Sequence, residues 1–230
     1  MFLETLNRAV GLIVRLDPDL IEIVLLSLRV TSVAILLATV LGLCIALLLE
    51  MWKGPGKGLI VSILNTLTGL PPVVVGLLLY IVLSRSGPLG FLDLLYTPMA
   101  MIIAQTVLAT PIVAALSHAA LTSGGQAVRH TALGLGATQF QARIALFKDG
   151  RYAIMAAVAA AFGRVIAEVG AVLMVGGNIA HHTRVMTTAI AMEADKGDFT
   201  LALGLGIILL GLSFLVNGAF YGFQRRGRKE

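Results

Sequence analysis

Charged residues are scarce in this sequence of 230 residues. Asp, Glu, Lys and Arg make up 13% of the chain, whereas about 25% is usual for soluble domains. Hydrophobic residues make up 58% of the chain, and the mean hydropathy is +0.95. This composition argues against an ordinary soluble domain and is typical of an integral membrane protein.

Cysteine is almost absent, since Cys44 is the single one and it lies in an apolar run. The sequence therefore supports neither a disulfide framework nor a cysteine-based metal cluster. His181 and His182 are adjacent, and neighbouring side chains point in different directions, which argues against a chelate. We expect no metal site in this chain and a solvated outer loop at the two histidines.

The formal net charge is +5, but the basic residues lie at the ends of apolar runs. Positive-inside topology explains this placement better than a nucleic-acid-binding face, so no nucleic-acid partner is expected. The chain also lacks Gly-x-x-x-x-Gly-Lys-Ser/Thr, the usual phosphate loop of ATPases. We find no nucleophile–base constellation and expect no enzymatic activity in this chain.

Five long apolar segments predict an all-α membrane protein with about five transmembrane helices. They cover residues 20–49, 59–83, 94–116, 152–175 and 200–223. The transmembrane domain would thus comprise residues 20–223. Residues 1–19 would form a helix on the membrane surface or a partly ordered tail, and residues 224–230 a basic cytoplasmic tail.

The second apolar segment is interrupted by Gly69 and the pair Pro71-Pro72. Two prolines remove two backbone donors and disfavour helix at the preceding residue. At membrane depth, freed backbone groups are tolerated only against protein or a water-filled cavity. We expect residues 66–75 to face other helices or a substrate pathway, the alternative being a simple kinked span.

Arg164 and Glu168 are the ionisable residues of the fourth apolar segment. They are four residues apart and could pair on one helix face. Ionisable groups at membrane depth usually face the bundle interior or a wet cavity. The two residues either lie near a pathway and its gate, or they form a buried clasp between helices. Small residues at a spacing of four also favour close helix packing there: Ala159, Gly163, Ala167 and Ala171.

The longest polar interruption covers residues 117–151. It holds four basic residues against one acid, Asp149: Arg129, Arg143, Lys148 and Arg151. Short loops rich in Lys and Arg stay in the cytoplasm. With this loop and the basic tail inside, five spans place the N-terminus outside and the C-terminus inside. Ten Lys and Arg residues would then be cytoplasmic against five clearly outside.

Residues 129–143, RHTALGLGATQFQAR, resemble the cytoplasmic coupling loop of permease subunits of type I ABC importers. Residues 130–132 stand at the Glu-Ala-Ala places of that loop, with His in place of Glu. Gly136 and Ala137 match its Gly-Ala. The Leu-Pro that follows in the family is replaced here by Lys148-Asp149.

Two flanking segments resemble the same family. Residues 69–76, GLPPVVVG, are similar to the PPxVxG stretch of molybdate, sulfate and tungstate permeases. Residues 163–171, GRVIAEVGA, and residues 174–179, MVGGNI, are similar to its fourth-span segment. In detail, EVGAVLMVGGNI followed by TRVMTTAI most resembles tungstate-type permeases, with molybdate permeases as near neighbours.

The resemblance implies the type I ABC importer permease fold and ATP-driven import of a tetrahedral oxyanion. Tungstate is the first choice of substrate, with molybdate or sulfate as alternatives. The implied partners are a second copy of this chain, two ATP-binding subunits that hold ATP and Mg²⁺, an extracytoplasmic oxyanion-binding protein and membrane lipid. The implied location is the prokaryotic cytoplasmic (inner) membrane, and no cofactor is expected in this chain itself.

The resemblance also implies roles for two groups of residues. Coupling to the ATPase, with Phe140 and Leu135 inserted into an apolar groove of that subunit, would involve Arg129, His130, Leu135, Gly136, Ala137, Phe140 and Arg143. The translocation pathway or its gate would involve Thr66, Thr68, Pro71, Pro72, Arg164, Glu168 and Asn178. Hydroxyls and backbone N–H groups are neutral donors, which suit an anion that must also leave.

Two other functions remain open at this point. One is a secondary transporter driven by protons through Glu168, which predicts inverted internal repeats that we do not find in the sequence. The other is a non-transporting membrane scaffold, which leaves the polar loop and the interrupted second span without a purpose.

Overall fold

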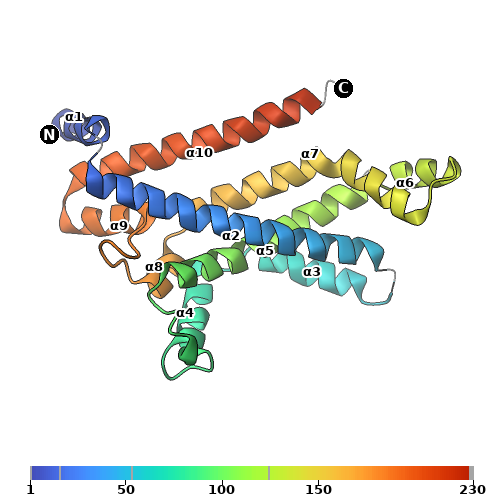
Figure 1. Cartoon of the computed structure of the whole chain (residues 1–230), viewed down its shortest axis with the longest axis horizontal. Coiled ribbons are helices and arrows are strands. Elements are labelled where there is room, and N and C mark those ends of the chain that lie inside the picture. The colour runs from blue at the N-terminus through green and yellow to red at the C-terminus, as the bar shows by residue number, and fades with distance from the viewer. Residues whose placement is uncertain (1, 16, 53, 124, 228–230) are drawn as a thin grey trace. The chain divides into compact units, whose positions relative to one another are not determined.

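The computed structural model describes residues 2–15, 17–52, 54–123 and 125–227. Over these residues the secondary structure is helical, without a strand (Figure 1). The elements are α1 (Phe2–Val14), α2 (Pro18–Met51), α3 (Lys57–Leu67), α4 (Pro72–Leu83), the 3-10 helix η1 (Gly90–Leu92), α5 (Pro98–Ser123), α6 (Gly125–Gly134), α7 (Gln139–Ile166), α8 (Gly170–Gly176), α9 (Met186–Lys196) and α10 (Phe199–Gly227). Residues 228–230 of the expected basic tail lie outside the described residues.

Three of these helices are long and apolar enough to cross a membrane: α2, α5 and residues Phe199–Gly222 of α10. Two pairs, α3 with α4 and α7 with α8, pass the same test together but are each bent at a short break. If each bent pair is one span, the described residues provide five. The predicted all-α fold with about five transmembrane helices is confirmed.

Two features differ from the sequence-based expectation. The fourth span, predicted over 152–175, is bent, because the helix breaks between α7 and α8. The loop predicted over 176–199 contains α9, whose start is stabilised by a hydrogen bond of 3.2 Å from Val185 N–H to Thr188 Oγ1. The polar segment 117–151 contains the end of α5, all of α6 and the start of α7, in keeping with the helix pair bent at Gly136 that the resemblance to the coupling loop implies.

The chain divides into two compact units, and the division runs through α2, α5, α7 and α10. The first unit comprises residues 1–34, 71–108 and 163–215. Its main buried cluster joins α2, α9 and α10 and consists of Leu20, Ile23, Met186, Ala189 and Leu205. Leu12 and Ile13 of α1 pack against this cluster, so α1 is part of the first unit.

The second unit comprises residues 35–70, 109–162 and 216–230. A Cβ placed on Gly42 of α2 would lie 2.8 Å from Val113 Cβ of α5, so a glycine is needed for the close approach of these two helices. Two buried clusters add α7 and α3: one of Ala46, Leu121, Leu146 and Ile154, and one of Leu49, Leu64, Ala114 and Ala115.

Candidate functional site

The second and fourth spans meet through their halves α4 and α8, both in the first unit. A Cβ on Gly76 would lie 2.8 Å from Ala171 Cα, and a Cβ on Gly170 would lie 2.7 Å from Val73 Cγ2. Such distances are too short for any larger residue, so both glycines are required for this packing. The two sequence segments that flank the polar loop in the resemblance are therefore packing partners.

The break between α7 and α8 bends the fourth span by 58°. A break at membrane depth frees backbone carbonyls that need other partners. Gln105 Nε2 donates a hydrogen bond of 3.1 Å to Val165 O, and Thr187 Oγ1 donates one of 2.8 Å to Glu168 O. Side chains of α5 and α9 therefore supply donors to carbonyls at the break.

The Glu168 carboxylate is 4% exposed and lies at the start of α8. Its Oε1 accepts a hydrogen bond of 3.0 Å from Ala171 N–H, one of the N–H groups that lack a partner within the helix. Its Oε2 lies 3.4 Å from Nη1 of Arg164, whose side chain is 46% exposed. Both carboxylate oxygens are thus engaged, which favours the clasp between helices; a role in gating stays a prediction.

The predicted hydroxyl donors of the second span are bonded within their own helix. Thr66 Oγ1 donates to Ser62 O at 2.9 Å, and Thr68 Oγ1 donates to Asn65 O at 2.6 Å. A hydroxyl has one proton to donate, so neither can donate to an anion in this conformation. Their contact with a substrate stays a prediction that requires a rearrangement.

Pro71 and Pro72 begin α4, at positions where a missing N–H costs nothing. The N–H groups of Val74 and Val75 both donate to Pro71 O, at 3.0 and 3.3 Å. These two backbone donors near the proline pair are therefore used inside the chain. The prolines themselves fix where α4 starts.

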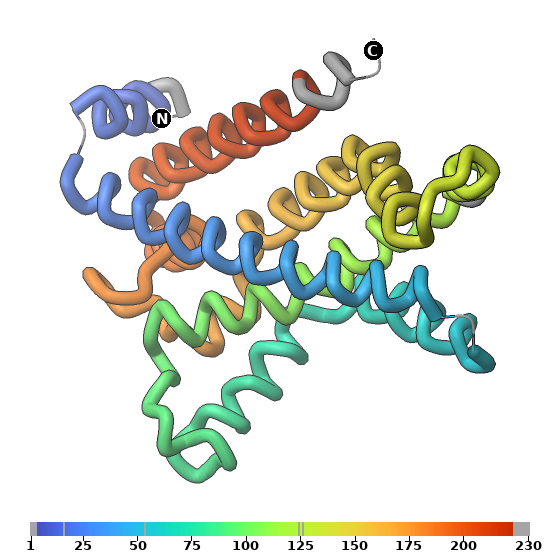
Figure 2. The backbone as a smooth tube through the Cα atoms, turned by 45° about the vertical axis from the view of Figure 1, so that its right-hand side comes forward, coloured from blue at the N-terminus to red at the C-terminus, as the bar shows by residue number. Residues whose placement is uncertain are grey.

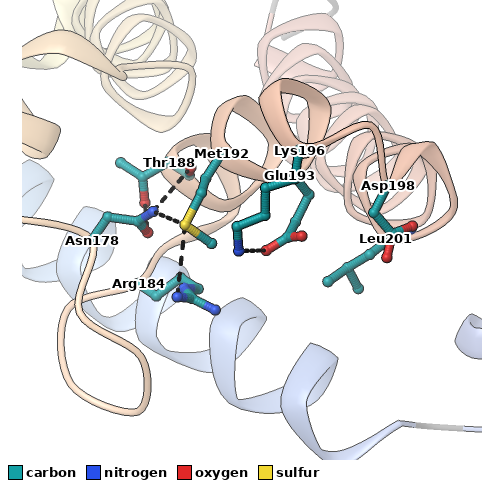
Figure 3. Close-up of polar contacts among 8 residues, drawn as sticks. All are labelled: Asn178, Arg184, Thr188, Met192, Glu193, Lys196, Asp198 and Leu201. Carbon is teal, nitrogen blue, oxygen red and sulfur yellow. Dashed lines mark hydrogen bonds and ion pairs between the residues drawn. The ribbon is translucent and has the colours of Figure 1, made fainter.

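Asn178 connects the segment after α8 to α9, as Figure 3 shows. Its Oδ1 accepts a hydrogen bond of 2.9 Å from Thr188 Oγ1, and its Nδ2 donates to Thr188 O at 3.4 Å and to Met192 Sδ at 3.2 Å. Arg184 Nη2 lies 3.8 Å from the same sulfur. The Asn178 amide is thus occupied and positions α9 in this structure.

The chain passes from α6 to α7 through a short turn (Figure 2). The helix α6 ends at Gly134, and Gly136 in the turn has a φ of +84°. Gly136 N–H donates to Leu133 O and Ala137 N–H donates to Ala132 O, both at 3.0 Å. This pair of bonds is the Schellman motif, and its left-handed residue is usually glycine. The bend predicted at Gly136 is present.

The start of α7 carries a reciprocal cap, and its two residues are not among the coupling residues expected from the sequence. Thr138 N–H donates to Gln141 Oε1 at 2.8 Å, and Gln141 N–H donates to Thr138 Oγ1 at 3.3 Å. The Thr-x-x-Gln pattern of such a capping box is visible in the sequence. Arg129 Nη2 also donates to Gln139 Oε1 at 3.0 Å, which ties α6 to α7.

Two large apolar side chains of this turn are strongly exposed. Leu135 is 83% exposed and Phe140 is 69% exposed. His130 is exposed as well, whereas Arg143 is half-buried. These two side chains therefore contribute little to the apolar core of the described chain.

The segment between α8 and α9 approaches α2 at His181. Its Nδ1 lies 2.8 Å from Glu22 Oε2, and both side chains are exposed. Asp19, Glu22 and His181 have ligand atoms within 4.8 Å of one another, so among the described residues they are the group that could hold a metal ion. The hydrogen bond to Glu22, and then its charge, raise the pKa of His181 above its ordinary value.

The sequence matches the family described as "Binding-protein-dependent transport system inner membrane component" over residues 32–229. The chain belongs to this family. Membership confirms the resemblance to ABC importer permeases. It also makes the chain a transport component of an inner-membrane system rather than an enzyme.

Three relatives match this permease along most of its length. The "Probable anion ABC transporter permease protein" of Haloferax volcanii is 43% identical, over 90% of this chain and 91% of the relative. The "Tungstate uptake system permease protein TupB" of Peptoclostridium acidaminophilum is 39% identical, over 96% and 97%. The protein of the same description from Campylobacter jejuni is 33% identical, over 92% and 88%.

Two solved structures share the fold of this permease. An amino acid ABC transporter with histidines gives a TM-score of 0.70 at 20% identity, over 93% of this chain and 96% of that chain. The MetNI methionine ABC transporter in inward facing conformations gives 0.72 at 19% identity, over 90% and 95%. At these identities the likeness concerns the fold alone.

The contact between Arg164 and Glu168 at the break in the fourth span predicts that their substitutions lower stability unequally and non-additively. Glu168→Ala should lower the melting temperature of the purified permease more than Arg164→Ala, because it removes the cap on Ala171 as well as the ion pair. The double variant should fall short of the sum of the two losses, by roughly the 0.5–3 kcal/mol seen for residues in contact. Glu168→Gln, which keeps an acceptor oxygen, is the matched control and should lie between wild type and Glu168→Ala. Losses that simply add would show that the two side chains act separately.

The His181–Glu22 pair predicts a pH-dependent contribution to stability. Because the folded-state pKa of His181 is raised, the contribution is fully present below the ordinary value of 6.5 and is lost as pH rises through the folded-state pKa. Thermal unfolding should therefore show a larger deficit of Glu22→Gln relative to wild type at pH 6 than at pH 9. His182→Ala should leave this pattern unchanged. A deficit that is constant or grows with pH would contradict the pairing.

Proposed function

We propose that this chain is the membrane-spanning permease subunit of an ATP-driven importer that carries a tetrahedral oxyanion, with tungstate as the substrate. Two relatives named as tungstate uptake permeases match more than nine tenths of the chain, and a third is named as an anion permease. Relatives named as sulfate permeases are more distant, with 28% identity for CysT of Salmonella typhimurium. Molybdate and sulfate are therefore the competing substrates.

The observation that carries the coupling role is the exposed pair Leu135 and Phe140 on the α6–α7 turn. The chain has no phosphate loop, so ATP and Mg²⁺ would bind to two separate ATP-binding subunits. A groove on such a subunit would receive the two apolar side chains, with His130, Arg129 and Arg143 around them. Because the turn is fixed by a Schellman motif and a capping box, a movement of the ATPase would pass to α7 as a rigid displacement.

We propose that this turn lies on the cytoplasmic side of the prokaryotic inner membrane, which the basic residues of segment 117–151 support. The N-terminus would then be outside and the C-terminus inside. An extracytoplasmic oxyanion-binding protein would deliver the substrate on the opposite side of the membrane. Selectivity can reside largely in that protein, because tight binding along the pathway would slow release.

The pathway would form between two copies of the chain. On α4, a line of apolar side chains spaced as one helix face is exposed: Val74 (47%), Leu78 (58%) and Ile81 (54%). A second copy would cover this face. In this arrangement Pro71, Pro72, Arg164, Glu168 and Asn178 hold the broken spans in shape around the pathway and act on the anion indirectly.

The proposed function is tested by reconstituting the chain with its ATPase and binding protein in vesicles. Uptake of labelled tungstate should require ATP, and excess unlabelled tungstate should compete better than molybdate or sulfate. Stronger competition by molybdate or sulfate would reassign the substrate within the class. Uptake that needs a proton gradient and no ATP would instead support a secondary transporter.

Gly136→Asp should uncouple ATP hydrolysis from transport while membrane insertion stays intact. A side chain at φ +84° is strained, at a cost of roughly 1–2 kcal/mol, and the added charge lies beside the apolar pair. Gly134→Ala is the matched control, since its Cβ also meets open space but its backbone is helical. Tungstate uptake and ATPase activity are measured together, and normal coupled transport by Gly136→Asp would show that the turn is not the coupling element.

A further inference from the structure

A cavity of about 180 Å³ opens where α2 and α5 end, within the second unit. Its polar lining includes Glu50, Lys57 and Arg129, and its apolar lining includes Trp52, Leu121 and Leu146. Of this lining, the proposed transport cycle uses only Arg129, which lies beside the proposed ATPase contact. The composition of the cavity nevertheless differs from that of a packing defect, because charged and apolar side chains meet in it.

The charges of the cavity leave a net positive balance. Neither Lys57 nor Glu50 forms an ion pair with a described residue, and the Arg129 guanidinium donates to the neutral Gln139 Oε1. Two cations against one carboxylate give a formal charge of +1. A singly charged anion balances this charge, whereas phosphate monoesters carry about −1.5 to −2 at pH 7.

The start of α3 adds to the preference for an anion. Lys57 is the first residue of α3, and the preceding Gly56 (φ +87°) provides no side-chain cap for the N–H groups there. The N-terminus of a helix favours negative charge near it. This attraction adds to that of the two cations for an anion in the cavity.

The position of the cavity indicates a lipid rather than a dissolved ion. Met51 and Ser123 end two helices that are apolar and long enough to cross the membrane, so a bilayer around these helices would bring its headgroups near the cavity. Trp52 is typical of that level, where its ring meets both lipid and water. Leu121 and Leu146 offer an apolar side that inorganic phosphate would not use.

We propose that this cavity binds the phosphodiester headgroup of an anionic phospholipid. Lys57 and Arg129 would contact the phosphate oxygens, as basic pockets at the ends of membrane helices do. Glu50 would accept hydrogen bonds from headgroup hydroxyls, which favours a polyol headgroup such as that of phosphatidylglycerol. Because Arg129 belongs to α6, the lipid would connect the α6–α7 turn to the ends of α2 and α5. The assignment does not depend on the substrate or on the orientation in the membrane.

The test is native mass spectrometry of the full chain in detergent, titrated with phosphatidylglycerol or with phosphatidylcholine. Wild type should retain one phosphatidylglycerol per chain in preference to phosphatidylcholine. Lys57→Gln and Arg129→Gln should each weaken this binding by about tenfold, as expected for loss of one charged hydrogen bond. Equal retention of the two lipids by wild type would overturn the proposal.

Two further variants separate the cavity from general surface charge and from misfolding. Lys148→Gln removes the same charge from an exposed position of α7 outside the cavity and should bind like wild type. Thr122→Leu fills the cavity without a change of charge, and its hydroxyl bonds only carbonyls of its own helix, so the variant should fold and yet lose the lipid. The site would be contradicted if Lys148→Gln weakened lipid binding as much as Lys57→Gln does. It would also be contradicted if a folded Thr122→Leu variant bound the lipid like wild type.

Inorganic phosphate in millimolar excess distinguishes the two sources of the phosphate group. It should leave the bound phosphatidylglycerol in place, because it cannot use the apolar side of the cavity. Displacement of the lipid by inorganic phosphate would overturn the lipid assignment in favour of a site for a free anion.

Discussion

Backbone groups at membrane depth have no water to bond, and the break in the fourth span removes helical partners from several of them. The structure meets this constraint with side chains that come from other helices. Gln105 of α5 and Thr187 of α9 donate to carbonyls at the break, and the Glu168 carboxylate accepts from the start of α8. Because these partners are specific, the break also determines where α5 and α9 must pack within the first unit.

The packing of α4 on α8 follows from the same constraint. Each of these short helices begins directly after a break and is too short to cross a membrane alone. Gly76 and Gly170 let the two backbones approach until Ala171 and Val73 fill the space between them. In lipid, where apolar surface gains little from burial, such close contact is a main source of helix association. The two breaks are therefore stabilised jointly, and a change at either glycine affects both spans.

How far the sequence predicts these features depends on whether their causes are local. The break at Pro71-Pro72 and the bend at Gly136 are predictable, because a missing N–H and a left-handed φ are properties of the residue itself. The break in the fourth span is not, since its Ala- and Val-rich residues also suit a continuous helix. Its cause is tertiary: Gln105 reaches Val165 from 60 residues away in the chain. Thr66 illustrates a second limit, because the sequence shows a donor but not that the donor is already bonded within its helix.

The α6–α7 turn and the break in the fourth span also differ in their response to substitution, because the turn has local causes and the break has tertiary ones. The α6–α7 turn is built from bonds between residues at most ten positions apart, so it keeps its shape without support from distant helices. Its exposed Leu135 and Phe140 contribute little to the fold. The fourth-span break, in contrast, depends on three helices at once. The proposed coupling surface lies on this locally determined turn, so its residues can change with little effect on the membrane core. Residues at the break cannot change without affecting how the core is packed.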